Sequence, residues 1–107
     1  MLNDYRKLSK EKRRQMDEKL QIIAGKLKCL GHPIRLQIVD ALRVEEPRTV
    51  TDLANFLDDP VEQSLLSHHL GKMRSMGILR AEKKGMFVFY SLEDRSVLDV
   101  FDISDIR

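Results

Sequence analysis

The chain has 107 residues, which is room for one domain, and 34% of them are charged although the net charge is only +2. A single cysteine excludes an intrachain disulfide and a zinc site built from several cysteines. There is no apolar signal core near the start and no apolar run of the ~18 residues that a membrane helix needs, so we expect a cytoplasmic protein with no membrane partner.

The basic residues are concentrated in two parts of the chain. Residues 1–30 carry nine Lys or Arg against four acids, and residues 61–90 carry five against two. Residues 31–60 and 91–107 each have a net charge of −3. A local basic face is typical of a DNA footprint. For the first block, a solvated helix surface is an equally good interpretation.

A first helix is predicted from a capping residue, Ser9, to about residue 30. Its apolar residues are spaced four, three, four and three positions apart, which makes a heptad seam: Met16, Leu20, Ile23, Leu27 and Leu30. The seam could pack on the chain's own core or on a partner helix. Residues 1–8 precede the helix and are expected to be disordered.

Two further helices follow. Gly31 ends the first helix, and Pro33 fits the first turn of a second helix with a wide buried face over residues 34–42. After a break at residues 45–47, Thr49 can cap a third helix, and Asp52 three positions later completes a capping-box pattern.

A fourth helix and a hairpin complete the pattern. Pro60 is expected to open this helix, which runs to about Met76. Gly77 then ends it in the left-handed conformation. Residues 78–83 and 86–92 read as two strands around a Lys84–Gly85 turn, and a last helix starts at residue 93.

The order is therefore four helices, a β-hairpin and a last helix, all within one domain spanning residues 1–107. The fold class predicted is mainly α (α+β), and the architecture is a winged helix-turn-helix. Helices three and four form the two-helix unit, and the hairpin is the wing.

The fourth helix has an apolar back and a polar front. Leu66, Leu70 and Met73 share one side, whereas the pairs Gln63–Ser64 and Ser67–His68 lie on the other. Adjacent helical positions point about 100° apart, so His68 and His69 cannot both face one groove. His69 is expected to be packed and hydrogen-bonded, and His68 is the candidate for DNA contact.

Two segments resemble the ArsR/SmtB family of bacterial transcription regulators. LGHPIRLQIVDAL at 30–42 looks like the second helix of that family, and SLLSHHLGKMRSMGILRAEKKGMFVFYSL at 64–92 resembles its recognition helix and wing. The resemblance implies a dimeric repressor that binds operator DNA and releases it on sensing a metal, a redox signal or another cue. It also implies dimerisation through the first and last helices, here residues 9–30 and 93–104.

The candidate site residues fall into two sets. Those expected to contact DNA are Thr49, Thr51, Gln63, Ser64, Ser67, His68, Lys72, Arg80, Lys83 and Lys84. Those expected at the dimer interface are Met16, Leu20, Ile23, Leu27, Leu98 and Phe101.

The sensory ligands of the family's metal branches are missing from this sequence. The third-helix segment VTDLANFLD has no cysteine, and the last-helix segment DRSVLDVFDISD has no histidine. We therefore predict no metal site and no cofactor, and the effector is unknown. Cys29 is expected to be an inert thiol, His32 to cap or support a helix start, and Met73, Met76 and Met86 to fill the core.

These features predict a dimeric, sequence-specific repressor whose partners are double-stranded DNA with an inverted-repeat operator and a second copy of the chain. The alternative is a winged-helix module for protein–protein assembly without DNA binding. An enzyme is not expected, because no nucleophile, base and orienting group occur together and no phosphate-binding loop is present.

Overall fold

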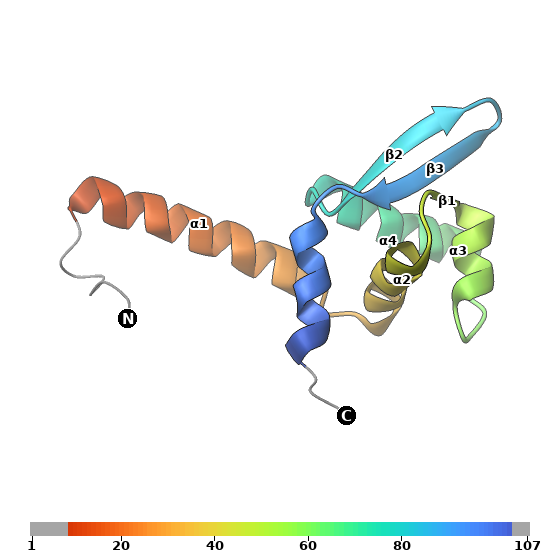
Figure 1. The fold of residues 1–107 in the computed structure, drawn as a ribbon, viewed down its shortest axis with the longest axis horizontal. Coiled ribbons are helices and arrows are strands. Elements are labelled where there is room, and N and C mark those ends of the chain that lie inside the picture. Colours follow the sequence, from red (N-terminus) through yellow and green to blue (C-terminus); the bar gives the residue numbers. More distant parts are fainter. Residues whose placement is uncertain (1–8, 104–107) are drawn as a thin grey trace.

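The computed structural model describes residues 9–103, so the expectations for residues 1–8 and for the helix end at residue 104 lie outside the described residues. Its elements are α1 (Lys10–Cys29), α2 (Pro33–Val44), β1 (Arg48–Thr49), α3 (Val50–Phe56), α4 (Gln63–Ser75), β2 (Leu79–Lys84), β3 (Phe87–Leu92) and a 3₁₀-helix, η2 (Arg95–Ile103) (Figure 1). This order confirms the predicted winged helix-turn-helix. The last helix differs from the expectation in its tighter 3₁₀ winding and in its start at Arg95, two residues later than predicted.

The core lies among α2, α3, α4 and the base of the hairpin. Its fully buried side chains are Ile38, Val39, Leu42, Leu53, Leu66, Leu70, Met73 and Ile78. The three from α4 are spaced four and three positions apart, as predicted, so they share one face of that helix. Burying each such side chain contributes roughly 1.5–3 kcal/mol. This packing fixes the rotation of α4 and leaves its opposite face in solvent.

The ends of α1 to α4 follow the sequence at every predicted point except the start of α4. The Ser9 hydroxyl caps α1 by accepting a hydrogen bond from the Lys12 backbone N–H at 3.2 Å. Thr49 and Asp52 form the predicted capping box at the start of α3. Gly77 has a φ of 74°, as its role at the end of α4 requires.

The predicted opening of α4 at Pro60 is wrong, because the helix starts at Gln63. Glu62 is extended, with φ −56° and ψ 138°, and its side chain forms no cap hydrogen bond. Val61 packs against the core and so anchors the segment before the helix. The loop after α3 is therefore longer than a proline-initiated helix would leave it.

The sheet has three antiparallel strands in the order β1-β3-β2. Lys84 pairs with Phe87, so the turn of the wing is Gly85–Met86, one position later than the predicted turn. Gly85 has a φ of 62°, which suits the first position of a tight hairpin turn. The two-residue strand β1 pairs Arg48 with Tyr90 and was not predicted, since two residues are too short to show alternation.

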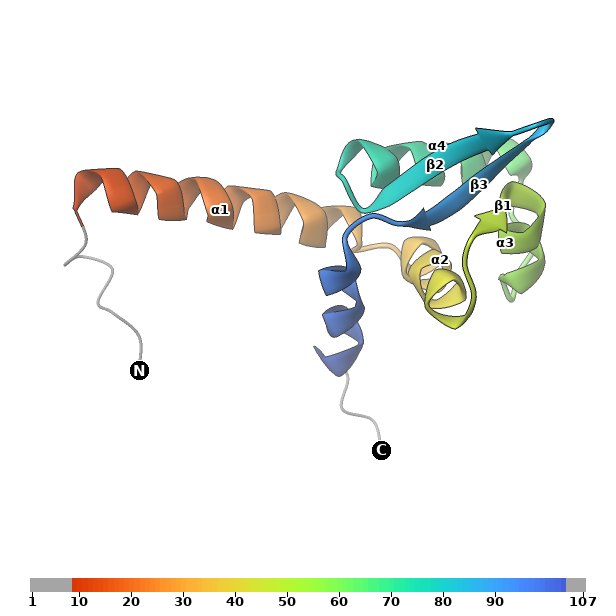
Figure 2. The ribbon, with the colours of Figure 1, turned by 45° about the horizontal axis from the view of Figure 1, so that its top comes forward.

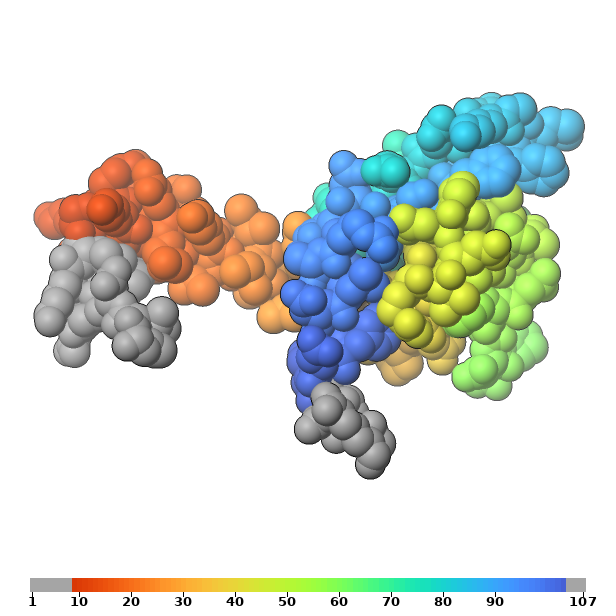
Figure 3. Space-filling model, viewed as in Figure 1, coloured from red at the N-terminus to blue at the C-terminus, as the bar shows by residue number. Residues whose placement is uncertain are grey.

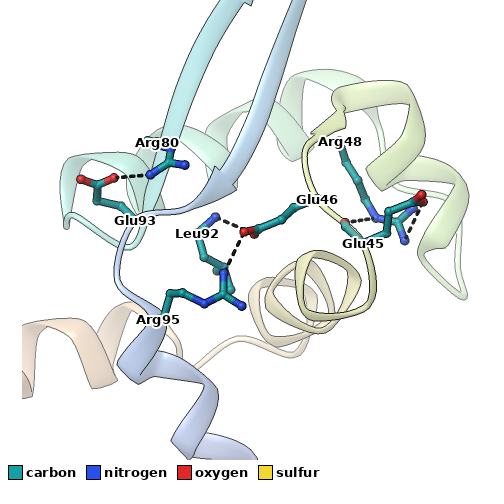
Figure 4. A network of polar contacts seen from close by, with 7 residues as sticks. All are labelled: Glu45, Glu46, Arg48, Arg80, Leu92, Glu93 and Arg95. Carbon is teal, nitrogen blue, oxygen red and sulfur yellow. Dashed lines mark hydrogen bonds and ion pairs between the residues drawn. The ribbon is translucent and has the colours of Figure 1, made fainter.

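Glu46 connects the loop before β1 to the base of the wing (Figure 4). Its carboxylate accepts hydrogen bonds from the Leu92 backbone N–H at 3.1 Å and from the Arg95 guanidinium at 2.7 Å. A second ion pair at 3.4 Å joins Arg80 of β2 to Glu93, just after β3. These contacts hold the base of the wing to the helical body and to the start of η2.

Helix α1 stands away from this body (Figures 1 and 3). Its 20 residues extend roughly 30 Å. Cys29 is its only buried residue, and Leu30, which follows the helix, is also buried. The helix packs closely against Met76 at Gly25, where an added Cβ would lie 2.9 Å from Met76 Cε. Leu30, at the end of the heptad seam, is buried in the chain's own core, whereas Met16, Leu20, Ile23 and Leu27 do not pack on it. Within residues 9–103, no helix has both the length and the apolar character needed to cross a membrane.

Candidate nucleic-acid interface

The polar front of α4 is open to solvent along its length. Gln63, Ser64, Ser67 and His68 are all exposed, whereas Leu66 and Leu70 on the back are fully buried. Lys72 and Arg74 continue the exposed side toward the end of the helix. The structure thus confirms the predicted separation of an apolar back from a neutral polar front with basic residues at its end.

Glu62 modifies the start of this polar front. Its Oε1 accepts a hydrogen bond from the Ser64 hydroxyl at 2.6 Å. The Ser64 proton is therefore engaged within the chain, and the hydroxyl oxygen is left to accept a hydrogen bond. In the major groove, the donors that such an oxygen can meet are the amino groups of adenine and cytosine.

Thr49 and Thr51 lie at the start of α3, as predicted. The Thr49 oxygen accepts from the Asp52 backbone N–H at 3.2 Å, which leaves its own proton available to a phosphate oxygen. Thr51 is exposed. Both hydroxyls sit where the partial positive charge of the helix terminus also favours an anion, although the Asp52 carboxylate opposes it.

The three basic wing residues occupy different positions on the hairpin. Lys83 and Lys84 end β2 next to the turn, whereas Arg80 lies near its base and is paired with Glu93 (Figure 4). Lys84 lies 3.9 Å from Glu82 in an exposed ion pair, which is weak in water. The two lysines are therefore better placed than Arg80 to reach a phosphate backbone.

Met86 lies in solvent and not in the core, so its predicted role as a core residue is wrong. It is 92% exposed at the turn of the wing, beside Phe87 at 61%. Met73 is fully buried and Met76 packs against the core, as expected. The misassignment arose because the turn was placed one residue too early, which put Met86 inside a strand.

A buried polar cluster lies behind α4. Arg35 donates from Nε to Nδ1 of His69 at 2.9 Å and from Nη1 to the Cys29 carbonyl oxygen at 2.9 Å. Arg35 and His69 are each 7% exposed, which confirms the predicted packed, hydrogen-bonded histidine. Cys29 is buried as expected. His32 is the residue preceding α2, but its side chain makes no cap hydrogen bond.

The pKa of His69 is lowered from its ordinary value of 6.5, first by burial and then by the Arg35 guanidinium. A histidine that accepts a hydrogen bond at Nδ1 must be neutral there, so protonation would break the contact with Arg35. Because the unfolded chain takes up this proton at a higher pH than the native chain, the stability contribution is complete above pH 6.5. It is lost as the pH falls through the native pKa.

We therefore expect the free energy of unfolding to fall as the pH is lowered below 6.5, and to fall less in His69→Gln. The difference between the two proteins, measured by urea unfolding at several pH values, isolates the contribution of His69. Asn55→Gln, at an exposed residue of α3, serves as the control and should keep the wild-type profile. An identical pH profile for wild type and His69→Gln would contradict this assignment.

A shallow apolar groove of about 410 Å³ runs between α1 and η2. Ile22, Ile23 and Leu27 line it from α1, and Val100 and Ile103 from η2. At one end Lys26 and Asp94 form a 2.6 Å ion pair, and the bond from Lys26 lowers the pKa of the Asp94 carboxyl.

Of the six predicted interface residues, Ile23 and Leu27 line this groove. Met16, Leu20, Ile23 and Leu27 are 39–52% exposed, which is unusual for large apolar side chains. Leu98 instead packs against the core of its own chain, and Phe101 lies beside the Arg43 guanidinium with its ring centroid 5.8 Å away. Sequence reasoning did not find Ile103, which is 76% exposed, because it lies beyond the apolar pattern used for the last helix.

Among the residues that the structure describes, no three His, Cys, Asp or Glu side chains are grouped to hold a metal ion. The absence of metal control stays a prediction, since ligands from a second chain could complete a site.

Comparison with known proteins identifies the fold and its relatives. Residues 30–82 match a family model described as a helix-turn-helix domain. A cadmium resistance transcriptional regulatory protein of Listeria innocua is 32% identical over 81 residues, which are 76% of this chain and 66% of that protein. The chain thus spans about two thirds of the length of that regulator.

Solved structures agree over a larger share of the chain. The crystal structure of NolR from Sinorhizobium fredii has a TM-score of 0.70 at 33% identity and covers 96% of this chain and 92% of NolR. The solution structure of Mb0332 from Mycobacterium bovis has a TM-score of 0.67 at 25% identity, covering 91% and 83%. Mb0332 is described as a homodimeric winged helix-turn-helix DNA-binding domain of a possible ArsR-family transcriptional regulator.

Proposed function

Since this chain belongs to the ArsR/SmtB family of winged helix-turn-helix transcriptional regulators, we propose that it is a homodimeric repressor that binds an inverted-repeat operator. The observation that carries the proposal is the exposed polar front of α4, held outward by its buried apolar back, with a wing that ends in two lysines beside it. The proposed role is regulation and not catalysis. We propose a cytoplasmic location, because this role requires access to chromosomal DNA.

In this proposal α4 enters the major groove with its N-terminal residues at the base edges. Gln63, Ser67 and His68 offer donors and acceptors there, and the Ser64 oxygen accepts from an adenine or cytosine amino group. Lys72 and the α3 hydroxyls of Thr49 and Thr51 contact phosphates beside the groove. The wing lysines and Arg80 contact the backbone on the far side.

Dimerisation uses the seam of α1 and the adjoining groove. The exposed apolar residues of α1 lie on a helix that stands away from the body, and such a helix is stable in water mainly when its apolar face is packed. A second copy of the chain supplies a matching surface around a two-fold axis. Two α4 helices would then enter successive major grooves ~34–36 Å apart.

Selection of bound sequences from random duplex DNA tests this function and reveals the operator in the same experiment. We expect an inverted repeat whose half-sites are one helical turn apart, confirmed by a salt-dependent shift of the labelled duplex. Failure to enrich any sequence, together with no shift at low salt, would instead favour the protein–protein assembly module.

Ser64→Ala and His68→Ala are each expected to change the base preference at one position of each half-site. A lost base contact costs roughly 1–3 kcal/mol of discrimination, so the preference should relax about tenfold at that position. Repeating the selection with each variant measures the effect. Gln15→Ala, on the exposed part of α1, is the matched control and should recover the wild-type operator. Unchanged preferences in both α4 variants would place the recognition surface elsewhere.

A further inference from the structure

The turn of the wing presents a large apolar side chain to solvent, which the contacts proposed above do not use. Met86 is 92% exposed, the highest value among the large apolar residues of the described chain, and Phe87 beside it is 61% exposed. Both ribbon views show the end of the hairpin projecting free of the helices (Figures 1 and 2). Solvent exposure of Met86 is unfavourable, and neighbouring residues of its own chain do not cover it.

We propose that Met86 is an apolar wedge that enters the minor groove of DNA and opens a base step there. The proposal rests on the proposed function, because it requires α4 to be bound in the neighbouring major groove. Apolar side chains that unstack base steps from the minor groove are a general device of DNA-bending proteins, and methionine is among the residues used.

The geometry of the turn selects Met86 for this role. The minor groove is only ~6 Å wide, whereas two paired strands already lie about 4.8 Å apart without their side chains. With its side chains the whole hairpin is too wide for an undistorted minor groove, so the turn is the part that enters. That turn consists of Gly85, which has no side chain, and Met86. Met86 is therefore the one turn side chain that can enter, and its unbranched chain fits a narrow groove.

The charges beside the turn suit the two walls of the groove. Lys83 and Lys84 immediately precede the turn, and successive strand residues point to opposite faces. Their ammonium groups can therefore reach phosphates on opposite strands of the duplex while Met86 lies between them. This charge complementarity makes DNA the occupant favoured over an apolar protein surface.

Two defined duplexes test the wedge without knowledge of the operator. One is 40 base pairs of alternating T and A, whose TA steps unstack easily, and the other is 40 base pairs of alternating C and G. We expect wild type to prefer the TA duplex by roughly tenfold. Met86→Gln should reduce this ratio several-fold, whereas Met86→Leu should retain it. Val44→Gln, at another exposed apolar residue, is the control and should behave as wild type.

Base unstacking gives a second readout. A 2-aminopurine in place of one adenine of the TA duplex should fluoresce more strongly when wild type or Met86→Leu binds, but not when Met86→Gln binds. An unchanged affinity ratio and an unchanged fluorescence rise in Met86→Gln would overturn the wedge while leaving DNA binding intact. Absence of binding to any duplex by wild type would overturn the proposed function, and the wedge with it. The exposure of Met86 means that these variants should fold normally, as thermal unfolding can verify.

Discussion

Replacing Ile23 with aspartate is expected to convert the proposed dimer to monomers and to abolish tight operator binding. Ile23 is 52% exposed in the single chain and lines the groove between α1 and η2. A carboxylate at this position would be buried without a partner in the dimer, which is strongly unfavourable. The monomer, in contrast, can keep it in water.

The loss of affinity should be large because the dimer binds two half-sites at once. Joining two binding modules raises the affinity for a bivalent site by roughly 10²–10⁴ over that of one module. Ile23→Asp should lose this factor on the full inverted repeat, and should bind a single half-site as weakly as wild type does. Sedimentation at micromolar concentration and titration of the two duplexes measure both effects.

Gln21→Asp is the matched control for this variant. Gln21 is exposed on the same helix but lies off the seam, so the same charge is added without entering the interface. It should remain dimeric and bind normally. Circular dichroism should show that Ile23→Asp is folded. A folded Ile23→Asp protein that still sediments as a dimer would exclude α1 as the dimer interface.

The sequence predicted the fold well where local chemistry dictates it. Ser9, Thr49 with Asp52, and Gly77 act at helix ends through their own side chains or backbone freedom, so their roles are readable from the residues alone. The spacing of the apolar residues in α4 likewise made it possible to predict which face of the helix is polar. The prediction from Pro60 was wrong because α4 starts only at Gln63, after Val61 has packed on the core, and that tertiary contact is not visible in the local sequence.

The parts of the site that escaped prediction depend on distant residues. The contact between Arg35 and His69 joins positions 34 residues apart, and no periodicity encodes it. Nor does any local pattern show that Arg80 is paired with Glu93 or that Leu98 faces its own core. The prediction for Met86 depended on the register of the hairpin, because a shift of one residue moves a side chain from the strand to the turn.

The buried cluster gives the two proposed surfaces a physical connection. Arg35 of α2 holds the Cys29 carbonyl at the end of α1 and the His69 ring on the back of α4. Gly25 of α1 also approaches Met76 at the end of α4. Helices α1 and α4 are therefore connected through Arg35 and through the approach of Gly25 to Met76, so the placement of α1 in the proposed dimer bears on the orientation of α4.

The wing lysines are expected to control how strongly DNA binding depends on salt. Each phosphate contact releases condensed counterions, and the slope of log K against log salt is about −0.9 per contact on duplex DNA. The double variant Lys83→Ala with Lys84→Ala removes four ammonium groups from a dimer. If all four contact phosphates, the slope should become shallower by about 3.6, and binding should weaken for every duplex sequence.

Lys10→Ala with Lys12→Ala removes the same number of charges from the outer end of α1 and is the matched control. It separates contact at the wing from a general loss of positive charge, and its slope should stay near that of wild type. Arg80→Ala should have a smaller effect than either wing lysine, because Arg80 already pairs with Glu93 at 3.4 Å. Fluorescence anisotropy on one duplex over a series of salt concentrations gives all the slopes. Equal slopes for wild type and the wing double variant would mean that the wing does not touch the phosphate backbone, even if α4 reads the operator as proposed.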